Sequence, residues 1–285
     1  MLKLHQLSDI SELQTICEKH DHIMLKLNWD MLKNRVPSSQ EDFFDYEDGE
    51  LRSFLALYQF GAKIEICGMT HPDYRLQGRF SRLWKQAVDS GLLANKEKVL
   101  FNVPQSSKGG QQWVASRHTG LNSVEYTLKL GDDVSGLGIG STEIVSLRPL
   151  TQEDAEFWAK LDAEAFGISE FHTLAALAGP HRPLSRAMHV IEYQGLAAGK
   201  IEVDRQGEHS WIYGFVVDPA LRGHGIGRSA LRQVALDEKG KGKQVWLDVV
   251  SENSRALHLY ESCGFVQQDI QDYYEYAYAA TQTNR

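Results

Sequence analysis

The sequence predicts an α/β fold made of two tandem copies of one unit. Its 285 residues are enough for two domains of ordinary size. A glycine-rich segment, residues 131–141, lies near the middle and has the composition of a linker. Strand, loop and helix patterns follow one another in the same order on both sides of this segment, which indicates an internal repeat.

The repeat is visible in three successive segments of each half. Arg75 and Arg222 occupy the same point of the first segment, 147 positions apart, and Asn102 and Asp248 the same point of the third, 146 positions apart. This near-constant offset favours two copies of one α/β unit. The paired segments are a strand that enters a loop (residues 64–78 and 211–225), a helix (80–90 and 228–238) and an apolar strand (99–103 and 245–249).

The domain boundary is expected within the glycine-rich segment. Residues 123–130 alternate in the manner of a strand before it, and residues 144–150 indicate a new strand after it. We therefore predict one domain over residues 1–135 and a second over residues 144–285. A last alternating segment, residues 271–278, is expected to form the final strand of the second domain.

The composition argues against nucleic-acid binding. Hydrophobic residues make up 42% of the chain and charged residues 24%, as in an ordinary globular protein. Lys and Arg number 16 against 18 Asp and Glu in residues 1–140, and 14 against 20 in residues 141–285. Because neither half carries the excess positive charge that a phosphate backbone attracts, we expect no nucleic-acid partner.

The chain is expected to work in the cytoplasm, away from membranes. No stretch approaches the roughly 18 consecutive apolar residues of a membrane-spanning helix, and the charged N-terminus lacks the pattern of a signal peptide. The three cysteines, Cys17, Cys67 and Cys263, are odd in number and show no paired spacing, which argues against a disulfide framework. Cys17 lies close to His20 and His22, but no second ligand cluster follows, so we expect no metal site.

The strongest functional signal is a strand that enters a glycine-rich loop and then a helix. Glycines at positions 223, 225 and 227 leave room for a ligand to approach the backbone. The first turn of the helix offers unpaired N–H groups and a positive dipole end, which suit a pyrophosphate group. Arg222 at the start of the loop can add charge-assisted hydrogen bonds to phosphate. The residues of this candidate site are Val216, Val217, Arg222, Gly223, His224, Gly225, Ile226, Gly227 and Arg228.

Two other phosphate-binding motifs do not fit this loop. A P-loop would continue with Gly-Lys-Ser or Gly-Lys-Thr, and neither follows Gly227. The dinucleotide fingerprint needs Gly-x-Gly-x-x-Gly directly after the first strand of its unit. Residues 223–227 instead read Gly-x-Gly-x-Gly and lie deep within their unit, which disfavours this motif.

A second signal lies in residues 247–265, where a strand leads through a polar turn into a short helix. The helix is expected to begin near Asn253 and to end at Gly264 in a left-handed cap. On this pattern alone, Tyr260 would be a core aromatic residue. One face of the helix carries Ala256, Leu259, Tyr260 and Cys263.

Residues 144–278 resemble the GNAT superfamily of N-acetyltransferases. The matching motifs are the Arg-Gly-His-Gly-Ile-Gly loop that starts at Arg222, the turn at Asn253 and the end of the helix after Tyr260. The resemblance implies a mixed, mostly antiparallel twisted sheet flanked by helices in each copy. It also implies that acetyl-CoA is the co-substrate and that its acetyl group passes to a primary amine of a small molecule or peptide.

The same resemblance implies roles for individual residues. The loop amides would hold the pyrophosphate of coenzyme A, and the backbone near Val216 and Val217 would pair with the pantetheine arm. Asn253 would contact the cofactor, and Tyr260 would protonate or hydrogen-bond the leaving thiolate.

The reaction also needs a base, because the amine must lose a proton before it attacks the thioester. Asp248 stands twelve positions before Tyr260, where some members of the family carry an acidic residue in this role. Asp248 could instead pair with a neighbouring charge. Glu202, Glu208 and a water relayed by Tyr213 are the alternatives for the base.

The N-terminal copy resembles the family more weakly. It keeps Gly78 in its loop but carries Phe80 where the second copy has Gly227, and residues 113–116 hold no tyrosine to match Tyr260. We therefore expect this copy to be catalytically degraded, with residual binding of coenzyme A left open.

Two other functions compete with acetyl transfer. A peptide-bond-forming enzyme that uses aminoacyl-tRNA would have a weak coenzyme A motif and a basic surface, and this sequence shows the opposite of both. A non-catalytic acyl-CoA-binding protein would fit the N-terminal copy. It fits the C-terminal copy poorly, because that copy keeps Tyr260 and an intact glycine loop.

Overall fold

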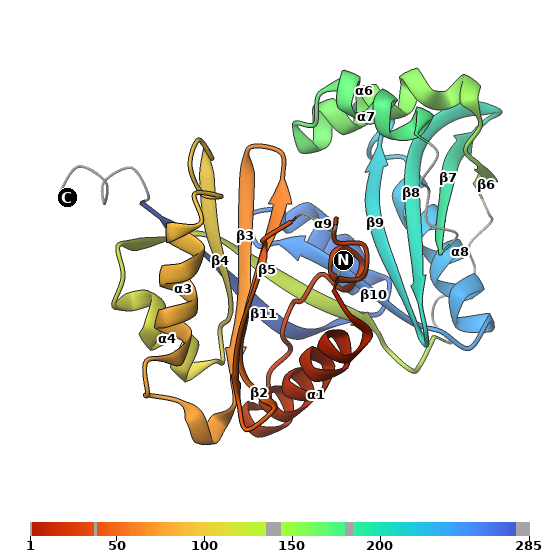
Figure 1. Cartoon of the computed structure of the whole chain (residues 1–285). Coiled ribbons are helices and arrows are strands. Elements are labelled where there is room, and N and C mark those ends of the chain that lie inside the picture. The colour runs from red at the N-terminus through yellow and green to blue at the C-terminus, as the bar shows by residue number, and fades with distance from the viewer. Residues whose placement is uncertain (1, 37–38, 135–143, 180–184, 278–285) are drawn as a thin grey trace. The chain divides into compact units, whose positions relative to one another are not determined.

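The computed structural model describes residues 2–36, 39–134, 144–179 and 185–277, which form two compact units (Figure 1). The first unit takes the chain up to Glu125 and again from Asp269 onward, and the second takes Tyr126–Gln268. Each unit is a mixed sheet with helices against it, so the fold class predicted from the sequence is confirmed.

The first unit contains one parallel pair of strands within an otherwise antiparallel arrangement. Its strand order is β1-β2-β3-β4-β11-β5. The pairs β1–β2, β2–β3 and β4–β11 are antiparallel, and β3–β4 is parallel. The elements that lie wholly in this unit are α1 (Leu4–Asp21), α2 (Trp29–Lys33), β1 (Asp42–Glu47), β2 (Glu50–Phe60), β3 (Lys63–Thr70), the 3₁₀ helix η1 (Pro72–Tyr74), α3 (Arg79–Asp89), β4 (Lys98–Pro104) and α4 (Lys108–Ala115).

The second unit repeats this pattern with one more edge strand. Its strand order is β11-β5-β10-β9-β8-β7-β6, in which β6 to β9 pair antiparallel and β9–β10 is the parallel pair. Its own elements are β6 (Val145–Pro149), the 3₁₀ helix η2 (Gln152–Asp154), α6 (Ala155–Phe166), α7 (Glu170–Ala178), β7 (Arg186–Tyr193), β8 (Leu196–Gln206), β9 (His209–Val217), the 3₁₀ helix η3 (Pro219–Leu221), α8 (Ile226–Gly240), β10 (Gln244–Val250) and α9 (Ser254–Ser262).

Two long strands, β5 (Thr119–Leu130) and β11 (Phe265–Tyr276), belong in part to each unit. The second half of β11 pairs with β4 in the first unit, ending at Glu275↔Leu100. In the second unit the end of β5 neighbours β10, and Thr127 Oγ1 donates to Asp248 Oδ1 at 2.7 Å. Each parallel pair therefore gains its next strand from the other half of the sequence.

This strand exchange changes the expected boundaries. The division falls inside β5 after Glu125, whereas the sequence suggested domains over residues 1–135 and 144–285. The expected final strand, residues 271–278, was placed in the second domain, but its described part completes the first unit because the edge of β4 needs a hydrogen-bonding partner. Residues 135–141 of the glycine-rich segment lie outside the described residues.

Helices cover both faces of β2, so this strand is apolar on both sides. In β2, Leu55 and Leu57 face the core beneath α3 and α4, while Phe54, Ala56 and Tyr58 face the core beneath α1 and α2. In the second unit, α8 and α9 enclose a hydrophobic core against β9 and β10.

The predicted helices are present. The patterns over residues 80–90 and 228–238 correspond to α3 and α8. The longest helix in the described part of the chain is α1, with 18 residues. None of these helices is both long and apolar enough to cross a membrane.

Candidate active site

The parallel strands β9 and β10 lie together over only part of their length. Their pairing ends at Ile212↔Leu247. Beyond it, the edge of β9 that carries Val216 and Val217 has no partner strand on the β10 side in the described structure. The result is a notch in the sheet whose wall offers backbone hydrogen-bonding groups.

A bulge on the other side of β9 accompanies this separation. The register between β8 and β9 shifts between Lys200 and Glu202, and Gly214 has a φ of 51°. This positive φ favours glycine, and a Cβ at Gly214 would lie 2.7 Å from Glu202 Oε1, so the Glu202 carboxylate would have to move. A glycine within an apolar strand often marks a bulge, so Gly214 is the residue whose sequence context could have predicted this feature.

The glycine loop follows β9 directly. Asp218 accepts a hydrogen bond from Ala220 N at 2.9 Å and so begins η3. The chain then passes through Gly223 with a φ of 85° and Gly225 with a φ of 78°, in the left-handed region that favours glycine. Since α8 begins at Ile226, its first-turn N–H groups have no acceptor within the helix. The predicted order of strand, loop and helix is present.

The charged residues of the loop remain exposed. Arg222 Nε donates to Val217 O at 3.1 Å, and its guanidinium makes no ion pair with any described residue. His224 turns back onto the loop, with Nδ1 3.1 Å from the carbonyl oxygens of Leu221 and Arg222. Arg228 is exposed in the first turn of α8. Two guanidinium groups are thus accessible beside the start of the helix.

Gly227 lies where α8, β9 and α9 converge. A methyl group at this position would be 3.5 Å from Phe215, Val217 and Leu259, which is ordinary contact distance. Alanine would therefore fit, whereas a larger side chain would fill the space beneath the first turn of α8.

Tyr260 is buried in α9, with 8% of its surface exposed. Its ring centre lies 6.4 Å from that of Phe215 and 6.3 Å from that of Phe265. Burial raises the pKa of Tyr260 to about 12, so the phenol keeps its proton at neutral pH. Its hydroxyl makes no hydrogen bond with another described residue and so remains a free donor.

The side chain of Asn253 caps the start of α9. Its Oδ1 accepts a hydrogen bond from Ala256 N at 3.2 Å and caps α9. Gly264, with a φ of 79°, follows the last turn of this helix as expected. The same helix face carries Ala256, Leu259, Tyr260 and Cys263 into the core.

Asp248 and Tyr260 lie on opposite faces of the sheet. Leu247 and Val249 point into the core that contains Tyr260, and Asp248 between them points to the other face. The Asp248 carboxylate accepts the hydrogen bond from Thr127 described above. Strand β10 itself therefore separates this carboxylate from the phenol.

The alternative bases differ in their surroundings. Glu202 lies at the bulge, with Oε1 3.7 Å from Lys200 Nζ and Oε2 3.7 Å from Arg186 Nη1. Burial raises the pKa of Glu202, and the charges of Lys200 and Arg186 offset part of that rise. Tyr213 pairs with Glu202 across β8 and β9, so the two residues lie side by side. Tyr213 is 37% exposed. Glu208 is exposed in the turn before β9, at the opposite end of that strand from the glycine loop.

Comparison with known proteins agrees with this geometry. The Acetyltransferase (GNAT) family matches residues 147–265. The N-alpha-acetyltransferase RimI of Mycobacterium tuberculosis is 34% identical over 132 residues, which cover 44% of this chain and 80% of that protein. Glucosamine 6-phosphate N-acetyltransferase 1 of Oryza sativa subsp. japonica is 30% identical over 116 residues, which cover 39% of this chain and 68% of that protein.

Solved structures share the fold of both units. A GCN5-related N-acetyltransferase from Sphaerobacter thermophilus has a TM-score of 0.74 at 19% identity and covers 94% of this chain and 91% of its own. A tandem GNAT protein from the clavulanic acid biosynthesis pathway has a TM-score of 0.67 at 15% identity, with 94% of each chain covered. The chain belongs to the GNAT family of acetyltransferases, as its sequence motifs implied.

Proposed function

We propose that the second unit transfers the acetyl group of acetyl-CoA to a primary amine of a small molecule or peptide. The observation that carries this proposal is the unpaired edge of β9, which leads directly into a glycine loop at the start of α8. An extended chain can pair with that edge while its pyrophosphate binds the first-turn N–H groups.

The residues of the loop fit such a ligand. Gly223 and Gly225 have positive φ angles, and the guanidinium of Arg222 has no carboxylate partner among the described residues. We assign the pyrophosphate to the amides of residues 223–228 with Arg222, and the pantetheine arm to Val216 and Val217. Since the Asn253 side chain caps α9, we assign its cofactor contact to the turn that it stabilises.

The proposed chemistry is direct attack. The amine nitrogen forms a bond to the thioester carbonyl carbon, the carbon–sulfur bond breaks, and the sulfur leaves as thiolate. A backbone N–H near Val217 stabilises the oxyanion, and the phenol of Tyr260 donates to the leaving sulfur. The free hydroxyl of Tyr260 and its raised pKa support this role, because the group is a donor at neutral pH.

We assign the base to Asp248, with Glu202 as the alternative. Asp248 holds a fixed position through its hydrogen bond from Thr127. Glu202 has a raised pKa, which suits a group that must accept a proton near neutral pH. The Asp248→Asn and Glu202→Gln variants distinguish the two.

Two further proposals concern the acceptor and the cellular location of the reaction. Both relatives are named as N-acetyltransferases, which supports an amine acceptor. We propose a cytoplasmic location, where the buried thiols of Cys17, Cys67 and Cys263 stay reduced. We further propose that the first unit does not catalyse acetyl transfer.

Release of free thiol from acetyl-CoA, measured against a panel of small-molecule and peptide amines, tests this function. We expect amine-dependent release by the wild-type chain and none by the Gly225→Glu variant. Acetyl-CoA binding without turnover of any amine would instead support a non-catalytic acyl-CoA-binding protein.

A further inference from the structure

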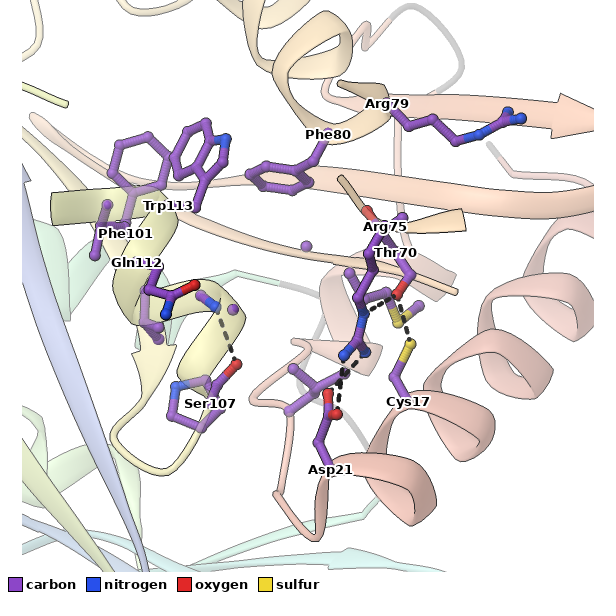
Figure 2. A pocket seen from close by; sticks show the side chains of 18 of the residues that line it. Cys17, Asp21, Thr70, Arg75, Arg79, Phe80, Phe101, Ser107, Gln112 and Trp113 are labelled. Atoms are coloured by element: carbon purple, nitrogen blue, oxygen red, sulfur yellow. Dashed lines mark hydrogen bonds and ion pairs between the residues drawn. The ribbon is translucent and has the colours of Figure 1, made fainter. Parts of the chain in front are cut away.

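The first unit contains a pocket that the proposed reaction does not use. Its volume is about 760 Å³, within the range of small-molecule sites. It lies where β3 and β4 separate, and its lining comes from this unit alone. Figure 2 shows Phe80, Phe101 and Trp113 gathered at one end, and Arg75 paired with Asp21 at the other.

One end of the pocket is aromatic. The ring of Trp113 meets Phe80 edge to face at 4.8 Å and Phe101 at 5.2 Å. Phe80 lies so close to β3 that a methyl group on Gly68 would be 2.4 Å from its ring. Phe80 thus fills the space that Gly227 leaves open in the second unit. This wall suits a flat apolar body and leaves little room for a pyrophosphate.

Two arginines of the pocket already have carboxylate partners. Arg75 donates to Asp21 at 2.9 and 2.7 Å. Arg79 donates to Asp45 at 2.9 Å and to Glu47 at 2.5 Å, and its side chain extends away from the pocket in Figure 2. Neither guanidinium is therefore free to bind a phosphate.

Arg117 differs from both. It makes no ion pair with any described residue, and its Nε is buried without a hydrogen-bond partner in the described structure. Its guanidinium lies 4.7 Å from the ring centre of Trp113, and Nη2 donates to Ser81 Oγ at 2.9 Å. Trp113 Nε1 donates to the same oxygen at 3.0 Å, so the Ser81 hydroxyl keeps its own proton for another acceptor.

We propose that this pocket binds a small carboxylate with an aromatic body. The ring would lie against Phe80, Phe101 and Trp113, and the carboxylate would accept hydrogen bonds from Arg117 and Ser81. A guanidinium that has no acidic partner beside an aromatic wall matches both parts of such a ligand. The site is separate from acetyl transfer, so its test does not depend on the proposed function.

Phenylacetate and its uncharged amide, phenylacetamide, are suitable probes. The tryptophan indole N–H signals of the full ¹⁵N-labelled chain report binding, and a Trp113→Phe variant assigns the signal of Trp113. We expect phenylacetate to shift that signal to saturation and phenylacetamide to bind about tenfold more weakly, because the charge-assisted hydrogen bonds are lost.

Variants sharpen the test. Arg117→Gln should remove the preference for the acid, and Arg117→Lys should retain part of it. Arg82 is an exposed arginine outside the pocket, so Arg82→Gln should leave the preference unchanged. The absence of a saturable shift, or equal affinity for acid and amide, would overturn the proposal. So would displacement of phenylacetate by acetyl-CoA in the Gly225→Glu chain, since the pocket would then be a second cofactor site.

Discussion

The notches of the two units share a backbone plan but differ in chemistry. The parallel pairing ends at Ile66↔Phe101 in the first unit and at Ile212↔Leu247 in the second, an offset of 146 positions for each strand. The loop arginines also make the same backbone contact. Arg75 Nε donates to Thr70 O at 3.0 Å, and Arg222 Nε donates to Val217 O at 3.1 Å.

The side chains around the two notches differ. The guanidinium of Arg75 forms an ion pair with Asp21, whereas that of Arg222 has no ion-pair partner among the described residues. Phe80 fills the space that Gly227 leaves open. The same backbone plan thus carries different side chains in the two units, which is why we propose different ligands for them.

The largest expected effect comes from a matched pair of glycine variants. Gly225 and Gly78 both precede a helix with positive φ, at 78° and 72°. Glu at position 225 places a carboxylate where we assign the pyrophosphate, so acetyl-CoA binding should fall below detection by calorimetry. Gly78→Glu introduces the same backbone strain but should leave one acetyl-CoA bound per chain. Two equivalent sites in the wild type, or binding that survives Gly225→Glu, would contradict the assignment.

Tyr260→Phe should lower turnover by roughly 10²-fold or more, as expected for loss of a general acid. The ring and its contacts with Phe215 and Phe265 are kept, so the melting temperature and acetyl-CoA affinity should change little. A collapse of both would show that Tyr260 is structural. Unchanged turnover would assign the leaving-group role to another residue or to water.

The sequence predicted the parts of this fold that depend on local signals. The glycine loop and the start of α9 near Asn253 rest on residues close together in the chain. The repeat could be recognised because each half carries local strand, loop and helix patterns in the same order. The strand exchange had no such signal, because β11 pairs with β4 across more than half the chain. The pairing of Arg75 with Asp21 joins residues 54 positions apart and was equally hidden.

Asp248→Asn should lower kcat/KM by roughly 10²-fold if Asp248 is the base. Glu202→Gln should then have less than about a tenfold effect. The reverse result would assign the base to Glu202. Since a base must be deprotonated, kcat/KM falls below its pKa, and the raised pKa of Glu202 would place this fall at higher pH than for an ordinary carboxylate.

The smallest effects come from the two loop arginines. Arg222→Gln should weaken acetyl-CoA binding about tenfold, because one charged donor to phosphate is lost, while stability should hardly change. Arg75→Gln should leave acetyl-CoA binding unchanged but lower the free energy of unfolding by about 1 kcal/mol, because Asp21 loses its arginine partner.

The acid dependence of stability distinguishes this explanation from a general packing defect. Burial alone would raise the pKa of Asp21, but the hydrogen bonds from Arg75 and His20 outweigh it and hold the pKa below its ordinary value of 3.8. The stability that the pair supplies is therefore present above pH 3.8 and lost as the pH falls through the lowered pKa. Urea unfolding of wild type and Arg75→Gln should show a difference at neutral pH that shrinks in acid. A difference that stays constant with pH would mean that Arg75 stabilises the first unit by packing and not by its charge.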